Sequence, residues 1–535
     1  MPPQNRGFVH GAMLLAAAAI ASKLLGSVYT IALQNIIGDH GMGLFQMAYP
    51  IYATLLAVAT AGFPVAISKL VAERLAVSDV TGARKVFRVA MVLLSAGGIA
   101  CFAILFFGAN MWAHVAGDPQ SAWAIRAIAP ALLIVPVMSA LRGYYQGYQW
   151  MEPTASSQVI EQLVRVVTIL GLALWLERAG YGQAMAAAGA AFGAVTGALG
   201  GFLLLLYFWR RDNALFTPAQ TVRSASTREL SRLLLYYAFP ISLGALVVPL
   251  MNNVDVTTVV NLLKSTGETQ TLATTQFGLL SGRAAKLMML PTTLAAGIGI
   301  AAMPAVSEAF ARGFRRLASE RMDTAIRLTL LLALPAAVGL FLLATPVDIA
   351  LFKDAAGAQT IRILAVATVF ASAQMTAAAL LQGAGWMYLP VFHLVIAGAV
   401  KLAANVLLVP RYGIDGAAAA TVLSYGVATA LNFAALAIRT REPIRWNQWL
   451  VRPALASFVM GACVYAMLRQ WMMWGGDQSG RVWIALASCA MIGVGMAVYV
   501  IALMVTGGMS ASEVRAVPRV GPPLATLCAR IGLLR

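Results

Sequence analysis

The sequence is poor in charge. Only 11% of its 535 residues are Asp, Glu, Lys or Arg, and the acids are scarcest, with 20 Asp and Glu against 38 Lys and Arg. A soluble globular chain carries about 25% charged residues. With 60% hydrophobic residues and a mean hydropathy of +0.79, this chain does not fit that class. The composition predicts a polytopic membrane protein.

Cysteine and histidine are also scarce, and their positions argue against several kinds of site. The cysteines are scattered without metal-ligand spacing or an external pair, at Cys101, Cys463, Cys489 and Cys528, so we predict neither a metal site nor a disulfide. The four histidines are dispersed as well, and no predicted outer loop is large. A polytopic glycosyltransferase or polymerase, which would cluster carboxylates or histidines in such a loop, is therefore disfavoured.

Long apolar runs are what the sequence has in abundance. A helix needs about 20 such residues to cross a hydrocarbon core of about 30 Å. Fourteen runs meet this need, at 8–36, 44–68, 86–112, 121–148, 154–176, 183–209, 233–263, 272–307, 324–346, 358–384, 387–410, 414–438, 450–474 and 482–506. We expect an all-α polytopic membrane protein with about 14 transmembrane helices.

The basic residues gather on one side of these spans. If the N-terminus is cytoplasmic, the inner segments carry most of the Lys and Arg, whereas the outer segments are balanced. This bias predicts that both termini are cytoplasmic. The net charge of +18 then follows from topology and from attraction to anionic lipid head groups, so we expect no nucleic-acid partner. The first run is too long for a signal peptide and lacks a cleavage site, so we expect a retained span.

A motif repeats along the chain. The segment QGYQWM at 146–151 returns as QGAGWM at 382–387, an offset of 236 residues, and the same offset carries Arg165 onto Lys401. An internal duplication of six spans explains this and suggests a pseudo-axis along the membrane normal. The predicted parts are an N-lobe at 1–215, a C-lobe at 225–440, two further spans within 441–510 and a cytoplasmic tail at 511–535.

Small residues mark a close helix contact. In GAAFGAVTGALGG, Gly189, Gly193 and Gly197 follow one another at four-residue steps. This spacing puts them on one helix face and predicts the close approach of a second helix.

The first span contains a lysine near its middle. Lys23 is followed at helical steps by Ser27, Thr30 and Gln34, which form a polar stripe on one face. A lysine at the centre of a span costs about 2.5 to 3.5 kcal/mol. We therefore expect this face to line a wet, substrate-binding cavity.

Other spans carry polar residues whose roles the sequence leaves open. Arg165 follows Glu161 by four residues and can form a local ion pair. Lys401 can pair with a distant acid, lock the lobes together or contact substrate. Asp255, three residues after Asn252, can partner a cation or help to bind a coupling ion.

Arg283 and Lys286 lie three residues apart in the eighth span, with no acid in that span to neutralise them. Five intramembrane cations thus face two acids, Glu161 and Asp255. The surplus predicts an anionic substrate, bound by Lys23, Arg283 and Lys286.

Several long segments resemble one known family. SKLLGSVYTIALQNIIGDHGMGLFQMAYPIYATLLAVATAGFPVAISKLVAE, RGYYQGYQWMEPTASSQVIEQLVRV and FPISLGALVVPLMNNVD are similar to the stage V sporulation protein B/YtgP branch of the MOP flippase superfamily, which includes the MurJ-type lipid II flippases. The resemblance covers about residues 5 to 440. It implies a fourteen-helix, two-lobed exporter of undecaprenyl-pyrophosphate-linked saccharide, above all the peptidoglycan precursor lipid II, in the bacterial plasma membrane.

The family pattern transfers residue by residue, with two departures. The essential arginine of its first span falls on Lys23, and the arginine of its eighth span falls on Lys286. A second first-span arginine falls on Tyr29, and an acid of the eighth span falls on Met289. Arg283 lies one turn from the family position and could replace the lost charge.

The expected mechanism is alternating access by a monomer whose partners are the lipid-linked saccharide and membrane lipids. No cofactor is expected, and turnover could be coupled to Na⁺, H⁺ or the membrane potential. Two rival functions stay open. One is a flippase for a capsule or O-antigen unit, and the other is a MATE-like drug/cation antiporter, which would need carboxylates in its cavity.

Overall fold

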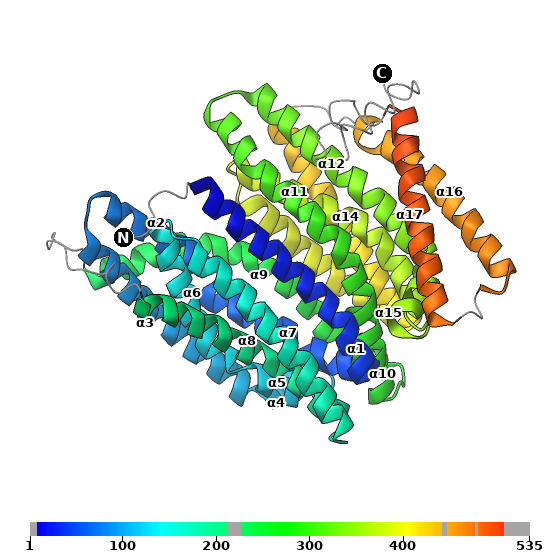
Figure 1. Ribbon diagram of the computed structural model, residues 1–535, viewed down its shortest axis with the longest axis horizontal. Coiled ribbons are helices and arrows are strands. Elements are labelled where there is room, and N and C mark those ends of the chain that lie inside the picture. The colour runs from blue at the N-terminus through cyan, green and yellow to red at the C-terminus, as the bar shows by residue number, and fades with distance from the viewer. Residues whose placement is uncertain (1–7, 212–225, 441–446, 477–479, 508–535) are drawn as a thin grey trace. The chain divides into compact units, whose positions relative to one another are not determined.

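The computed structural model describes residues 8–211, 226–440, 447–476 and 480–507, and every regular element in these ranges is helical. In chain order (Figure 1) the helices are α1 (Phe8–Thr60), α2 (Phe63–Ala76), α3 (Val80–Phe107), α4 (Ala109–Ala116), α5 (Ser121–Ile128), α6 (Ala131–Gly147), α7 (Glu152–Arg178), α8 (Gln183–Arg211), α9 (Thr227–Ser265), α10 (Gln270–Gly278), the π-helix η2 (Leu279–Ala284), α11 (Ala285–Ala311), α12 (Arg315–Leu342), α13 (Ala344–Phe352), α14 (Ala358–Gly383), α15 (Tyr388–Thr440), the π-helix η3 (Asn447–Val451), α16 (Arg452–Met473) and α17 (Arg481–Val505).

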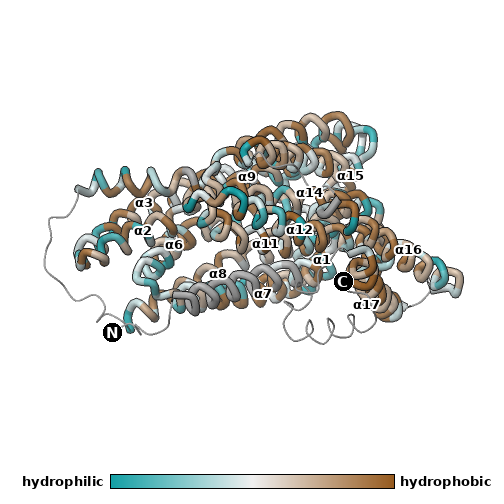
Figure 2. Tube along the Cα trace, turned by 90° about the horizontal axis from the view of Figure 1, so that it is seen from above, coloured by the Kyte–Doolittle hydropathy of each residue, from teal (hydrophilic) through white to brown (hydrophobic). Residues whose placement is uncertain are grey.

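Twelve helical segments of the described residues are long and apolar enough to cross a membrane. Hydrophobic residues dominate the helices, and many hydrophilic ones lie near helix ends (Figure 2). Two segments contain a kink with positive φ, at Gly38 (69°) in α1 and at Gly413 (59°) in α15. Glycine adopts these angles without a Cβ penalty. Both kinks fall between predicted spans, so the predicted fold class of about fourteen membrane helices is confirmed.

The chain divides into two compact units, Met1–Gly282 and Arg283–Arg535. The division falls inside η2, so that α10 belongs to the first unit and α11 to the second. Packing thus groups α9 and α10 with the first six spans. The predicted lobes at 1–215 and 225–440 follow the sequence repeat instead of the packing, and their limits stay a prediction.

The two copies of the repeated motif fold into the same turn. Gln149 in the first copy and Gly385 in the second both have positive φ, at 57° and 93°. The next residue in each copy donates its backbone N–H to the carbonyl five positions earlier, at 3.1 Å for Trp150 and 2.9 Å for Trp386. Residues 236 positions apart in the two copies therefore share the same backbone turn as well as similar residue types.

In the first unit, α7 packs directly on the glycine face of α8. A Cβ added at Gly193 would meet the side chain of Ile169, and one added at Gly197 would lie 2.7 Å from both the Arg165 Cβ and the Glu161 carbonyl oxygen. The close approach predicted from the glycine spacing is confirmed. It brings α8 against the charged part of α7.

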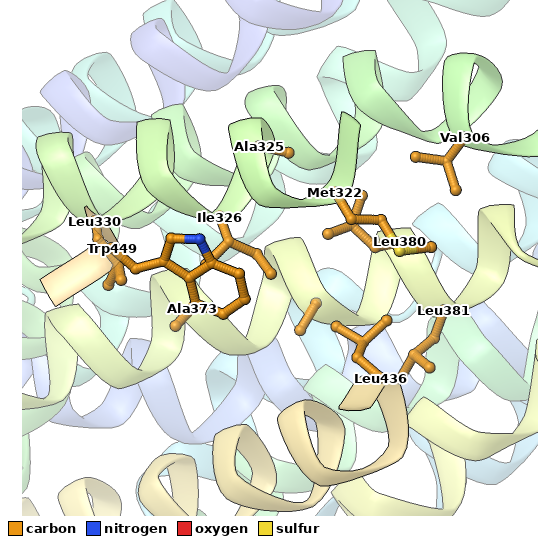
Figure 3. Packing of buried hydrophobic residues seen from close by; sticks show 11 residues of the cluster. Val306, Met322, Ala325, Ile326, Leu330, Ala373, Leu380, Leu381, Leu436 and Trp449 are labelled. Atoms are coloured by element: carbon orange, nitrogen blue, oxygen red, sulfur yellow. The ribbon is translucent and has the colours of Figure 1, made fainter. Parts of the chain in front are cut away.

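The core of the second unit is built from α11, α12, α14 and α15. Figure 3 shows Met322 of α12 beside Leu380 of α14, and Ile326 of α12 beside Trp449 of η3 at one end of the cluster. The two C-terminal helices pack on this core, and the Tyr499 hydroxyl of α17 donates to the Leu331 carbonyl at 2.8 Å.

We predict that Gly197→Ala destabilises the protein by about 1–3 kcal/mol, because the new methyl group overlaps α7 and no flexible side chain can yield. Gly171→Ala is the matched control, since Gly171 lies on α7 with open space around its Cα. The measurement is the thermal unfolding temperature in detergent. Equal temperatures for the two variants would contradict the close contact.

Candidate functional site

The side chains of Lys23 and Ser27 lie outside the described residues, although the backbone of both belongs to α1. Gln34, the last residue of their stripe, is buried. Its amide donates to Asp39 Oδ1 at 2.6 Å and, at 3.5 Å, to the carbonyl of Gly278 in α10. In this conformation the Gln34 amide group helps to join α1 to α10, and its substrate contact stays a prediction.

A charged cluster lies inside the first unit. Glu161 accepts from Arg165 of the same helix at 2.6 Å and from Arg142 of α6 at 2.9 Å. Arg142 also donates to the Ser157 hydroxyl at 3.0 Å. The local pair of Glu161 and Arg165 is therefore present. Arg142 gives the cluster a net positive charge, and helical spacing within one span does not predict its pairing because Glu161 lies on another helix.

Polar atoms without partners face this cluster. The side chains of Tyr29, Tyr49 and Tyr52 lie near Arg165. Among the described residues, the buried Nε of Arg165 and the buried hydroxyl of Tyr52 have no hydrogen-bond partner. Unsatisfied buried groups of this kind call for water or a ligand, and a net positive cluster favours an anionic one.

Arg283 lies in a different setting from the one expected. Its guanidinium is 3% exposed and contacts two carboxylates of the second unit, at 3.2 Å to Asp348 of α13 and 2.7 Å to Asp354 in the following turn. The expectation that Arg283 is an uncompensated cation is wrong, because acids more than 60 residues away neutralise it. Its role in substrate binding stays a prediction that the function proposed below does not need.

The two carboxyl groups differ in their titration. Hydrogen bonds from Arg283 hold the pKa of Asp354 below its ordinary value. Burial raises the pKa of Asp348 to about 6, in spite of the guanidinium beside it. Asp354 therefore remains charged over a wider pH range and keeps Arg283 paired when Asp348 takes up a proton.

Lys286 follows Arg283 by one turn, in the first turn of α11. It is half-buried, and it forms no hydrogen bond or ion pair with any described residue. Met289 is 46% exposed at the position of the family's acid. Lys286 is thus an intramembrane cation whose charge no described side chain matches.

The remaining predicted residues lie on α9 of the first unit and α15 of the second. Asp255 is half-buried and Asn252 exposed on α9, and the contact with α1 is made instead by Asn253, which donates to Thr54 Oγ1 at 2.6 Å. Lys401 is 3% exposed within α15 of the second unit. Their roles in ion coupling or in joining the lobes stay predictions.

Comparison with known proteins agrees with this picture. Residues 8–310 match the model of the family described as polysaccharide biosynthesis protein. An uncharacterized membrane protein of Bacillus subtilis, YabM, is 33% identical over 95% of this chain and 94% of its own length. The lipid II flippase MurJ of the same organism is 30% identical over 92% and 94%.

Solved structures agree on the fold. An inward-closed structure of the lipid II flippase MurJ matches with a TM-score of 0.65 at 14% identity, over 92% of this chain and 98% of that one. An inward-facing MATE family multidrug transporter of the MOP superfamily matches with a TM-score of 0.66 at 18% identity, over 78% and 94%. The chain therefore belongs to the polysaccharide biosynthesis protein family.

Proposed function

We propose that this protein is a flippase that exports a lipid-linked saccharide across the bacterial plasma membrane, with lipid II as the first candidate. The observation that carries the proposal is Lys286, a half-buried cation in a membrane helix that no described side chain neutralises. The near full-length similarity to a lipid II flippase supports it.

Binding of an anionic substrate would offset the free-energy cost of placing these cations in the membrane. A pyrophosphate group offers oxygens that accept hydrogen bonds from lysine and arginine, and such bonds strengthen when water is partly excluded. We assign head-group binding to Lys23 and Lys286. The Arg142, Glu161 and Arg165 cluster adds a net positive charge inside the first unit.

An apolar groove in the second unit suits the prenyl tail. It has a volume of about 720 Å³ and lies between α12, α14 and α16, with Val338, Phe341, Val366 and Phe458 among its lining residues. Its wall is almost wholly hydrocarbon. The groove offers a polyprenyl chain more contact than lipid alone, while the charged head group enters the protein.

The membrane potential can drive this transport. Carrying an anion outward, and returning an emptied cationic site inward, each gain about 2.3 kcal/mol per charge per 100 mV. Asp255 and Asn252 are the candidates for an additional Na⁺ or H⁺ coupling site. A monomer suffices for this mechanism.

The rival functions differ in the charge they require. A drug/cation antiporter needs carboxylates in its cavity. The intramembrane acid Glu161 is instead paired with two arginines, Arg142 and Arg165. A flippase for a capsule or O-antigen unit uses the same cationic chemistry. Complementation of a strain depleted of its lipid II flippase separates this alternative from lipid II.

We expect Lys23→Ala and Lys286→Ala each to lower lipid II flipping about tenfold or more, the loss expected for a charge-assisted contact. Lysine to arginine at either site should retain part of the activity, because the positive charge remains. The measurement is lipid II exposure on the outer leaflet of depleted cells. Arg469→Ala, an exposed cation on α16, is the control, and full activity of either alanine variant would refute the assignment.

Asp255→Asn tests ion coupling. We expect slower turnover with unchanged substrate affinity, since the carboxylate is assigned to the ion and not to the head group. Flipping is measured in proteoliposomes across a range of Na⁺ concentrations and pH. If rates equal those of the parent under every condition, Asp255 has no part in coupling.

Ala462→Trp tests the groove. Ala462 lines it, so a tryptophan there should weaken binding of prenyl-linked substrate while leaving binding of a tail-free head-group analogue intact. Ala466→Trp is the control, since Ala466 is exposed on the same helix and does not line the groove. Equal binding of prenyl-linked substrate by both variants would place the tail elsewhere.

A further inference from the structure

The sequence repeat reaches a pair of aspartate turns. Asp118 and Asp354 are separated by the same 236 residues as the QG motifs, and each follows a residue with positive φ, Gly117 at 92° and Lys353 at 81°. Each carboxylate accepts the backbone N–H two residues later at 2.9 Å. Both turns fall in segments predicted to face outside.

In the first unit, Asp118 ties its turn to α10. The carboxylate is fully buried and accepts from Thr274 Oγ1 at 2.7 Å and from Gln270 Nε2 at 2.8 Å. The end of α9 holds the same turn, because Lys264 donates to the Gly117 carbonyl at 2.9 Å. A buried carboxylate without these donors would be costly.

In the second unit, Asp354 accepts hydrogen bonds from a guanidinium, whereas Asp118 accepts them from a hydroxyl and an amide. Arg283 at the end of η2 donates to both of its carboxylate oxygens, at 2.7 and 3.1 Å, and to Asp348 as well. Of the two pairs, the Arg283–Asp348 pair is the buried one, with side chains 3% and 0% exposed, whereas Asp354 is 53% exposed. Breaking the buried pair would leave an uncompensated buried charge. The side chains that donate to Asp118 are neutral, and such hydrogen bonds are weaker than those between two charged groups.

The α10 helix also lies unusually close to α1. A Cβ at Gly43 would overlap the Thr274 carbonyl, and a Cβ at Gly278 would overlap the Asp39 carbonyl. The two backbones therefore touch directly. Hydrogen bonds from α1 join this contact, because Gln34 donates to the Gly278 carbonyl at 3.5 Å and Gln46 to the Ser281 carbonyl at 2.9 Å. The bonds of Asp118 hold α10 to another neighbour, the turn between α4 and α5.

The two aspartate contacts are nine residues apart along one membrane segment, and η2 lies between them. A π-helix within an α-helix is a less regular and often functional turn. Segment 270–284 is thus held by a weaker contact at Thr274 and a stronger one at Arg283, with an irregular turn between.

We propose that Asp118 is a releasable latch on α10, and that Asp348 and Asp354 are the permanent anchor of the same segment through Arg283. Release of Thr274 and Gln270 from Asp118 opens the predicted outer end of the first unit. This proposal does not depend on which substrate is carried, but it rests on the alternating access of the proposed function.

Cysteine accessibility tests the latch without any substrate. The four native cysteines are replaced, and Val260→Cys is introduced as the reporter, since Val260 is fully buried beneath the Gly117 turn. In cells treated with a membrane-impermeant maleimide, Thr274→Val and Asp118→Ala should raise its labelling about tenfold, the effect of losing a charge-assisted hydrogen bond. Thr275→Val is the control, because the Thr275 hydroxyl bonds only to its own helix at Thr271.

A second reporter separates opening from unfolding. Ala190→Cys, fully buried in α8, should keep its labelling rate in every variant. Unchanged labelling at Val260→Cys in the Thr274→Val variant, which preserves side-chain shape, would overturn the latch, and so would equal increases at both reporters. If labelling rises as expected but the protein fails to complement a lipid II flippase, the latch stands and the proposed substrate falls.

Discussion

The cost of placing a charge in a hydrocarbon layer governs the design of this protein. Each cation in a span must meet an acid, water or a ligand, or it would not be retained there. Among the described residues, two groups of cations meet acids. Arg283 is neutralised by Asp348 and Asp354, and Arg142 and Arg165 share Glu161. No described side chain neutralises Lys286, and the proposal of an anionic substrate therefore rests on this residue.

Close backbone contact is the second constraint, because apolar side chains gain little from one another inside lipid. Glycines permit α8 to lie against α7 at Gly193 and Gly197, and α10 to cross α1 at Gly43 and Gly278. The first contact surrounds the charged residues of α7 and fixes them. The second also includes hydrogen bonds from α1, of Gln34 to the Gly278 carbonyl and of Gln46 to the Ser281 carbonyl.

The two copies of the aspartate turn have the same backbone conformation but bind different side chains. Asp118 and Asp354 occupy the same position in equal turns, yet the first accepts from neutral donors and the second from a guanidinium. A change of partner, with no change of turn, exchanges neutral donors for a charged one.

The membrane class, the number of about fourteen spans, the repeat and the glycine face of α8 can all be predicted from the order of residues along the chain, because none of them requires knowing which helices become neighbours. Even the kinks at Gly38 and Gly413 fall where the apolar runs are interrupted. Which charges are neutralised depends instead on how the helices pack. Arg283 meets acids 65 and 71 residues away, and Arg142 meets Glu161 across two helices. Such pairs depend on which helices become neighbours, and helical spacing within one span carries no information about that.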